Sequence, residues 1–235
     1  MLKAILFDLD GTLLPMDIDT FTHGYFRGLA KKAAPLGYEP KKLVDGIWYG
    51  TGAMVRNDGH CTNEEAFWEA FSAFYGRDAR ADSPVFDEFY GNEFREAVVF
   101  ASPNPEKAQQ AVRLARSKAQ KVILATNPIF PASGVRTRLG WLGLSFADFD
   151  DVTSYETSHY CKPNPDYFRE ILTAHSLAPE ACCMIGNDVQ EDVEPAAALG
   201  MSSFLVTDCV INRAPTLPDV PQGSFDELLA FLAQL

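Results

Sequence analysis

The chain alternates short apolar runs with longer stretches of helical spacing, and this alternation constrains its fold more than any other feature. The apolar runs fall at residues 2–7, 122–125, 182–185 and 203–206. The helical stretches fall at residues 105–118, 131–142, 165–174, 194–199 and 225–235. Buried parallel strands read as continuous apolar runs, and the helices between them serve as crossover connections. The sequence therefore predicts an α/β fold built on a parallel sheet.

A different pattern occupies residues 17–95. This stretch lacks β-branched runs and places apolar residues at helical spacing, as in Phe67 and Phe71. It is expected to form an all-helical domain inserted into an α/β domain made of residues 1–16 and 96–235. Its many aromatic side chains are expected mainly to fill the core of a small bundle. Alternatively, a minority of them would line a substrate pocket, because ligand sites favour domain interfaces.

The charge balance limits the partners of the chain. Its 32 acidic and 20 basic residues give a formal net charge of -12, which repels polyanions at long range. Nucleic acid is therefore not an expected partner, and no feature indicates an obligate protein partner. A small phosphorylated metabolite can still bind if a cation and a few local donors neutralise its charge.

The N-terminal apolar stretch and the cysteines predict a cytoplasmic protein. The stretch is too short for a membrane span or a signal peptide, so no membrane association is expected. The five cysteines are odd in number and show no zinc-site or disulfide spacing. We interpret them as reduced thiols, with Cys182 and Cys183 on opposite faces of a strand.

Two carboxylates, Asp8 and Asp10, follow the first apolar run. Residues two apart on a strand face the same way, and open α/β sheets bind ligands at the carboxyl ends of their strands. Two close carboxylates are costly unless a cation or a shared proton relieves their repulsion, so Mg²⁺ is a natural occupant. Alternatively, the Asp-x-Asp-Gly sequence would only end the strand in a turn.

Three further polar groups follow the later apolar runs. Thr126 and Asn127 supply a hydroxyl and an amide that can bind phosphate oxygens. Lys162, held by the rigid Pro163, can place an ammonium near a metal and a phosphate. An acidic segment at residues 186–192 comes directly before a helix. Each group alone has a plainer interpretation as a polar strand end, a surface lysine or an acidic helix start. Their shared positions at successive strand ends favour one common site.

The chain resembles the haloacid dehalogenase-like hydrolase superfamily over nearly its whole length. The resemblance rests on four motifs, which lie at residues 8–12, Thr126, Lys162 and residues 186–192. It implies a Rossmann-like parallel-sheet domain of the phosphatase type, with a helical cap inserted between the first and second motifs. Substrate choice usually resides in that cap.

The resemblance also implies roles for individual residues. Asp8 would be the nucleophile and Asp10 the general acid/base. Thr126 would bind the phosphate, and Lys162 would stabilise charge. Thr12 is expected not to bind the metal or the phosphate itself but to orient the residues that do.

The metal ligands are less directly implied, because the family commonly has an aspartate after the glycine of its fourth motif. Here Asn187 holds that position and Asp188 follows. We expect Asp8, Asp10 and Asp188 to hold Mg²⁺, with Asn187 as the rival to Asp188. Asp192 lies four residues after Asp188, so a pair of acidic residues is present, and Asp192 is expected to orient the metal ligands.

These expectations describe a Mg²⁺-dependent phosphatase that hydrolyses a small phosphorylated metabolite through an aspartyl-phosphate intermediate. A phosphomutase is an alternative, because a cap that excludes water would let a second hydroxyl receive the phosphoryl group. A phosphate- or metal-binding regulatory protein with low turnover is another. Dehalogenation is disfavoured by the presence of Asp10.

Overall fold

The computed structural model describes residues 2–235 and contains a six-stranded parallel sheet in the order β3-β2-β1-β4-β5-β6. The predicted α/β fold with a parallel sheet is thus confirmed. The strands are β1 (Leu2–Phe7), β2 (Ala119–Leu124), β3 (Asp151–Val152), β4 (Cys182–Gly186), β5 (Ser202–Val206) and β6 (Gln222–Gly223). All four predicted strands exist, with ends that differ by three residues at most.

The central strand β1 is buried on both faces. Phe7 packs into one hydrophobic cluster and Leu6 into the other, as the two-residue period of a strand requires. Cys182 and Cys183 of the neighbouring β4 divide between the same two clusters, and both are free thiols. Their predicted placement on opposite faces is therefore confirmed.

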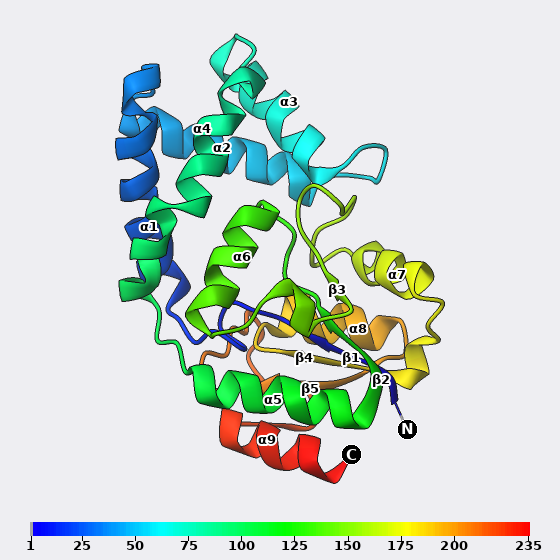
Figure 1. Ribbon diagram of the computed structural model, residues 1–235. Coiled ribbons are helices and arrows are strands. Elements are labelled where there is room, and N and C mark those ends of the chain that lie inside the picture. The colour runs from blue at the N-terminus through cyan, green and yellow to red at the C-terminus, as the bar shows by residue number, and fades with distance from the viewer. Residues whose placement is uncertain (1) are drawn as a thin grey trace.

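Helices cover both faces of the sheet (Figure 1). On the side of Phe7 lie α5 (Pro105–Lys118) and α9 (Phe225–Gln234), and on the side of Leu6 lie α7 (Pro165–Ala174) and α8 (Glu194–Ala198). A further helix, α6 (Ala132–Trp141), lies between the sheet and the upper helices. These helices match the predicted stretches to within one residue at each end.

The edge strands β3 and β6 were not predicted. Each contains only two residues, which is too short to show a periodic pattern in the sequence. Their pairing is decided by the neighbouring strand, which offers its backbone groups at that position.

Residues 18–100 contain helices and turns only, in agreement with the predicted helical insert. The α-helices are α1 (Ile18–Ala33), α2 (Pro40–Val55), α3 (Asn63–Tyr75) and α4 (Ser83–Gly91). Short 3₁₀ helices are η1 (Ala34–Leu36), η2 (Arg80–Asp82) and η3 (Glu93–Phe100). They form the upper part of the molecule in Figure 1. Since η3 runs past residue 95, the helical segment extends beyond the predicted domain boundary.

No helix within residues 2–235 is both long enough and apolar enough to cross a membrane.

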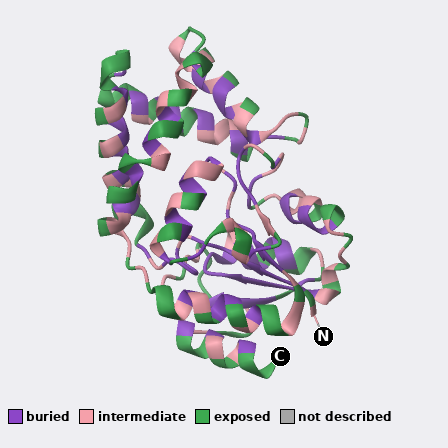
Figure 2. Cartoon of the chain, in the orientation of Figure 1, coloured by how far each residue is buried: buried purple, intermediate pink, exposed green. Residues whose placement is uncertain are grey.

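Aromatic packing joins the helical insert to the α/β part. Phe94 of η3 is fully buried and contacts Tyr25 of α1, with ring centroids 5.7 Å apart. On its other side Phe94 meets Trp141 at 5.7 Å and Phe130 at 6.2 Å. The same inward-facing pattern holds through the molecule, whose strands and inner helix faces are buried while outer helix faces are exposed (Figure 2). One continuous apolar cluster thus spans both parts of the chain.

Replacing Phe94 with alanine should lower the free energy of unfolding by about 3–5 kcal/mol, because the lost ring leaves a cavity between the helical insert and the α/β part. Urea denaturation of purified protein would measure the change. The matched control is Val99→Ala in the same helix, where the side chain is 75% exposed and an effect below about 0.5 kcal/mol is expected. Equal effects of the two substitutions would contradict the packing described for Phe94.

Candidate active site

The predicted site residues converge at the carboxyl ends of the three central strands. Asp8 directly follows β1, Thr126 is the second residue after β2, and Asn187 directly follows β4. Because β1 lies between β2 and β4, these three strand ends are adjacent in the sheet. Lys162 reaches the same place from the loop before α7. The edge predicted for ligand binding therefore carries the predicted polar groups.

Lys162 is the buried centre of the site. Its side chain is 1% exposed, and its Nζ donates to Asp8 Oδ1 at 2.9 Å and to Asp192 Oδ1 at 2.6 Å. Burial by itself lowers the pKa of Lys162, but Asp192 and Asp8 outweigh this effect and raise the pKa well above its ordinary value. The lysine is therefore a fixed positive charge against the proposed nucleophile.

Asp192 ties Lys162 to the loop after β4. Its Oδ2 accepts hydrogen bonds from the backbone N–H groups of Asn187 at 3.1 Å and Asp188 at 3.0 Å. This close packing requires Gly186, because a Cβ there would lie 2.2 Å from Asp192 Oδ2. Burial raises the pKa of Asp192 and Lys162 opposes the shift. Asp192 therefore connects Lys162 to the backbone of residues 187 and 188.

Thr12 stands between Asp8 and Asn187. Its Oγ1 lies 3.3 Å from Asp8 Oδ2 and 3.0 Å from Asn187 Oδ1, so its single hydroxyl hydrogen is shared between two acceptors. Gly11 permits this approach, because its φ is +85° and a Cβ would lie 2.3 Å from Asn187 Nδ2. One carboxylate oxygen and one amide oxygen are consequently held near each other.

Asp188 has different partners. Its Oδ1 accepts hydrogen bonds from the backbone N–H groups of Gln190 at 2.9 Å and Glu191 at 3.0 Å, which is the geometry of a helix N-cap. Arg213 also donates to this oxygen at 2.9 Å. Of the two rival residues, Asn187 is the one that the structure joins to Asp8 through Thr12.

Thr126 and Asn127 differ in how their side chains are engaged. Asn127 Oδ1 accepts a hydrogen bond from the backbone N–H of Lys162 at 3.2 Å, and its Nδ2 donates to Glu191 Oε2 at 2.9 Å. Thr126 is buried, and its backbone carbonyl accepts hydrogen bonds from Thr153 and Tyr167. Asn127 thus braces the loop that carries Lys162, whereas Thr126 is fixed through its backbone.

Asp10 faces a different cation from Asp8. The strand ends at Phe7, so the strand rule that predicted parallel side chains does not extend to residue 10. Asp10 Oδ2 forms an ion pair with Nη1 of the fully buried Arg138, whereas its Oδ1 is buried without a hydrogen-bond partner among residues 2–235. Burial raises the pKa of Asp10, Arg138 opposes the shift, and Asp8 adds to it.

Arg138 was missed in the sequence. It lies on α6, where Nε donates to the Gly134 carbonyl at 3.3 Å and the guanidinium lies 4.1 Å from the ring of Phe130. The available signal was its spacing, because Arg138 falls three residues after Val135 and next to Leu139 on the apolar face of the helix. A charge on such a face needs a buried partner.

The donor chemistry of the site fits magnesium with few protein ligands. Within residues 2–235, no group of three or more His, Cys, Asp and Glu side chains is arranged to hold a metal. The oxygens of Asp8 and Asn187 that approach Thr12 instead form a mixed carboxylate and amide set. Mg²⁺ usually keeps several waters and binds through one or two carboxylates plus substrate phosphates, so this small oxygen set is compatible with it.

The chain thus combines a parallel α/β sheet with a carboxylate that faces a buried lysine at the carboxyl ends of the strands. The sequence pattern of haloacid dehalogenase-like hydrolases matches residues 2–200, and the chain belongs to that family. The predicted family is thus confirmed.

Three known proteins illustrate the similarity. Haloacid dehalogenase-like hydrolase domain-containing protein 3 of Bos taurus is 26% identical over 98% of this chain and 92% of its own. Phosphoglycolate phosphatase of Aliivibrio fischeri is 27% identical over 99% of this chain and 97% of its own. The crystal structure of 2-haloacid dehalogenase from Pseudomonas syringae has a TM-score of 0.63 at 21% identity, covering 100% of this chain and 99% of that one. The structural likeness establishes a shared fold.

Replacing Arg138 with methionine should lower the free energy of unfolding by about 3–5 kcal/mol, because Asp10 would remain buried without its cation. The double variant Arg138→Met with Asp10→Asn should recover part of this loss, which urea denaturation would measure as a coupling energy. Arg136→Met on the exposed face of α6 is the control and should cost less than about 1 kcal/mol. Additive effects of the two single changes would contradict the ion pair.

Proposed function

We propose that this protein is a Mg²⁺-dependent phosphatase that hydrolyses a small phosphorylated metabolite through an aspartyl phosphate on Asp8. The observation that carries the proposal is the position of Asp8, whose two oxygens face a buried ammonium on one side and the Thr12 hydroxyl on the other. Such a carboxylate is oriented and its charge is partly balanced, which a nucleophile toward a phosphate anion requires.

In the first step, an oxygen of Asp8 attacks phosphorus and the bond from phosphorus to the alcohol oxygen breaks. Lys162 holds Asp8 in place and offers positive charge near the phosphoryl oxygens. The Thr126 hydroxyl would hydrogen-bond one of those oxygens. Asn127 would act indirectly, because its amide is engaged with the backbone of Lys162 and with Glu191.

Asp10 would move the protons. With Oδ2 bound to Arg138, the unpartnered Oδ1 is the atom available to protonate the leaving alcohol oxygen. The ionised Asp10 then takes a proton from the water that attacks the phosphorus of the aspartyl phosphate, which releases inorganic phosphate and restores Asp8. The raised pKa of Asp10 favours the protonated form that the first step needs.

Asp8 and Asn187 would hold Mg²⁺ with their side-chain oxygens, and Asp10 would contribute its backbone carbonyl, because its side-chain oxygens serve Arg138 and proton transfer. When bound, this ion would neutralise charge on the phosphoryl oxygens. We favour Asn187 over Asp188 as the ligand from β4, because Asp188 already caps the following helix and pairs with Arg213. Thr12 and Asp192 would keep the ligands oriented from behind.

The name of the Aliivibrio fischeri relative, a phosphoglycolate phosphatase, supports phosphate-ester hydrolysis as the reaction. In this proposal residues 17–95 act as the cap over the site, and residues 1–16 and 96–235 form the catalytic domain. The identity of the alcohol would then be set where the helices meet the sheet.

Replacing Asp8 with asparagine should reduce phosphate release from p-nitrophenyl phosphate by ~10⁴-fold or more, because the amide cannot form the covalent intermediate. Colorimetric phosphate assay in excess Mg²⁺ would measure it, with circular dichroism to verify folding. The control Asp19→Asn, on the exposed surface of α1, should retain wild-type activity. A folded Asp8→Asn enzyme with wild-type turnover would contradict the assignment of Asp8 as the nucleophile.

Removing divalent ions with a chelator should abolish phosphate release, and adding Mg²⁺ back should restore it. Asn187→Ala should raise the Mg²⁺ dissociation constant by roughly tenfold or more, since it removes a direct ligand. Asp188→Asn serves as the matched comparison and should change the Mg²⁺ dissociation constant less. Isothermal titration with Mg²⁺ alone would test both variants, and the reverse order of effects would show that Asp188 is the ligand.

A further inference from the structure

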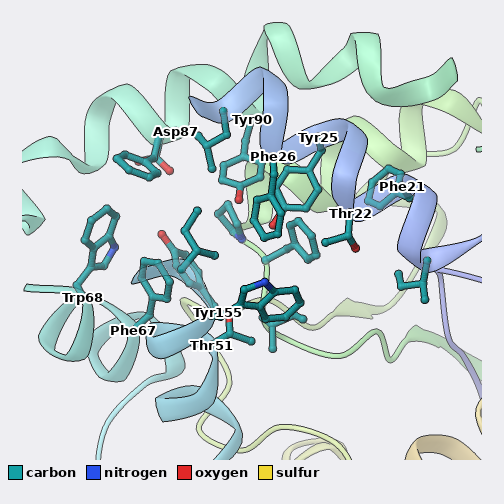
Figure 3. A pocket seen from close by; sticks show the side chains of 18 residues that line it. Phe21, Thr22, Tyr25, Phe26, Thr51, Phe67, Trp68, Asp87, Tyr90 and Tyr155 are labelled. Carbon is teal, nitrogen blue, oxygen red and sulfur yellow. The ribbon is translucent and has the colours of Figure 1, made fainter. Parts of the chain in front are cut away.

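An aromatic cavity lies among the helices of the insert, next to the proposed catalytic site. It is lined by eighteen residues, which come from α1 to α4, from residues 129–131 and from Tyr155 (Figure 3). Residues 129–131 follow Asn127 after one intervening residue, Pro128. One of its walls, Phe130, also lies against Arg138, the partner of Asp10. The cavity is therefore well placed to receive the alcohol portion of a substrate.

The size of the cavity suits one small ring. Its volume is about 130 Å³. An apolar cavity of roughly 150 Å³ is large enough for a benzene molecule. The walls are rich in aromatic rings, among them Phe26, Phe67, Tyr90 and Tyr155. An apolar group of about six heavy atoms would fill this space.

The charge of the cavity restricts what the alcohol can carry. Among its eighteen lining residues, Asp87 is the single charged side chain, and none is lysine, arginine or histidine. Asp87 makes no ion pair with the other residues in the range 2–235. Asp87 is an exposed residue at the edge of the cavity, where partial burial raises its pKa and nearby Glu156 adds to the shift. A carboxylate on the alcohol would be repelled here, whereas a cation would be attracted.

We propose that the cavity binds the alcohol portion of a phosphate monoester, and that this portion is a ring-sized apolar group that carries an ammonium. The ammonium would pair with Asp87 and lie against the faces of the surrounding rings, which attract cations. This inference rests on the proposed phosphatase function and specifies its substrate class. It also separates this chain from enzymes that must bind a carboxylate next to the phosphate ester.

Three para-substituted phenyl phosphates would test the inference, bearing an aminomethyl, an ethyl or a carboxymethyl group. They share the ring and differ mainly in the charge at its far end. We expect kcat/KM for the aminomethyl ester to exceed that for the carboxymethyl ester by about tenfold or more, because an ion pair and a cation–π contact replace a repulsion. Asp87→Asn should reduce this ratio to about twofold.

Glu88→Gln is the matched control, because it removes one negative charge from the same helix at a residue that pairs with Lys32 outside the cavity. This variant should keep the full ratio. Equal kcat/KM values for the two charged esters, or a ratio that survives Asp87→Asn, would overturn the inference. If no ester, including p-nitrophenyl phosphate, releases phosphate, the phosphatase proposal itself fails, which is a distinct result from a loss of charge preference.

Discussion

The candidate active site depends on one buried cation, the ammonium of Lys162, which lies between Asp8 and Asp192. Removing a charge from water is costly unless partners compensate it, and here two carboxylates do so, Asp8 directly after β1 and Asp192 in the helical segment after β4. Asp192 also accepts hydrogen bonds from the backbone N–H groups of Asn187 and Asp188, which fixes the loop after β4 relative to Lys162. This network connects the ends of β1 and β4 and orients Asp8 before any substrate arrives.

A second buried ion pair connects the site to the cap. Arg138 binds Asp10 with one edge of its guanidinium and lies on the ring of Phe130 with its face. Phe130 packs in turn against Phe94 of the helical insert. Asp10, the group proposed to move protons, is thus connected through Arg138 to Phe130 in the wall of the cavity that would hold the alcohol. Two separate carboxylate and cation pairs allow Asp8 and Asp10 to have different environments and therefore different tasks.

Local sequence patterns predicted those parts of the fold that depend on near neighbours. The helices α5 and α7 begin at the predicted residues, because Asn104 and Asn164 cap their N-termini ahead of a proline. β1 ends at Phe7 as predicted, but the orientation of Asp10 was not predicted, since the turn at Gly11 depends on contact with the distant Asn187. The role of Arg138 was not predicted for a similar reason, because its ion-pair partner Asp10 is 128 residues away in the sequence.

By itself, the sequence determined the α/β architecture, the helical insert and the set of polar residues at the strand ends, because apolar periodicity and strand-end position are properties of short segments. Only the tertiary structure decided which of these residues meet. It joined Asn187 rather than Asp188 to Asp8 through Thr12, and it assembled an aromatic cavity from helices distant in the chain. Hydrogen-bond partners and enclosed volumes arise from the packing of whole elements, and no local pattern encodes them.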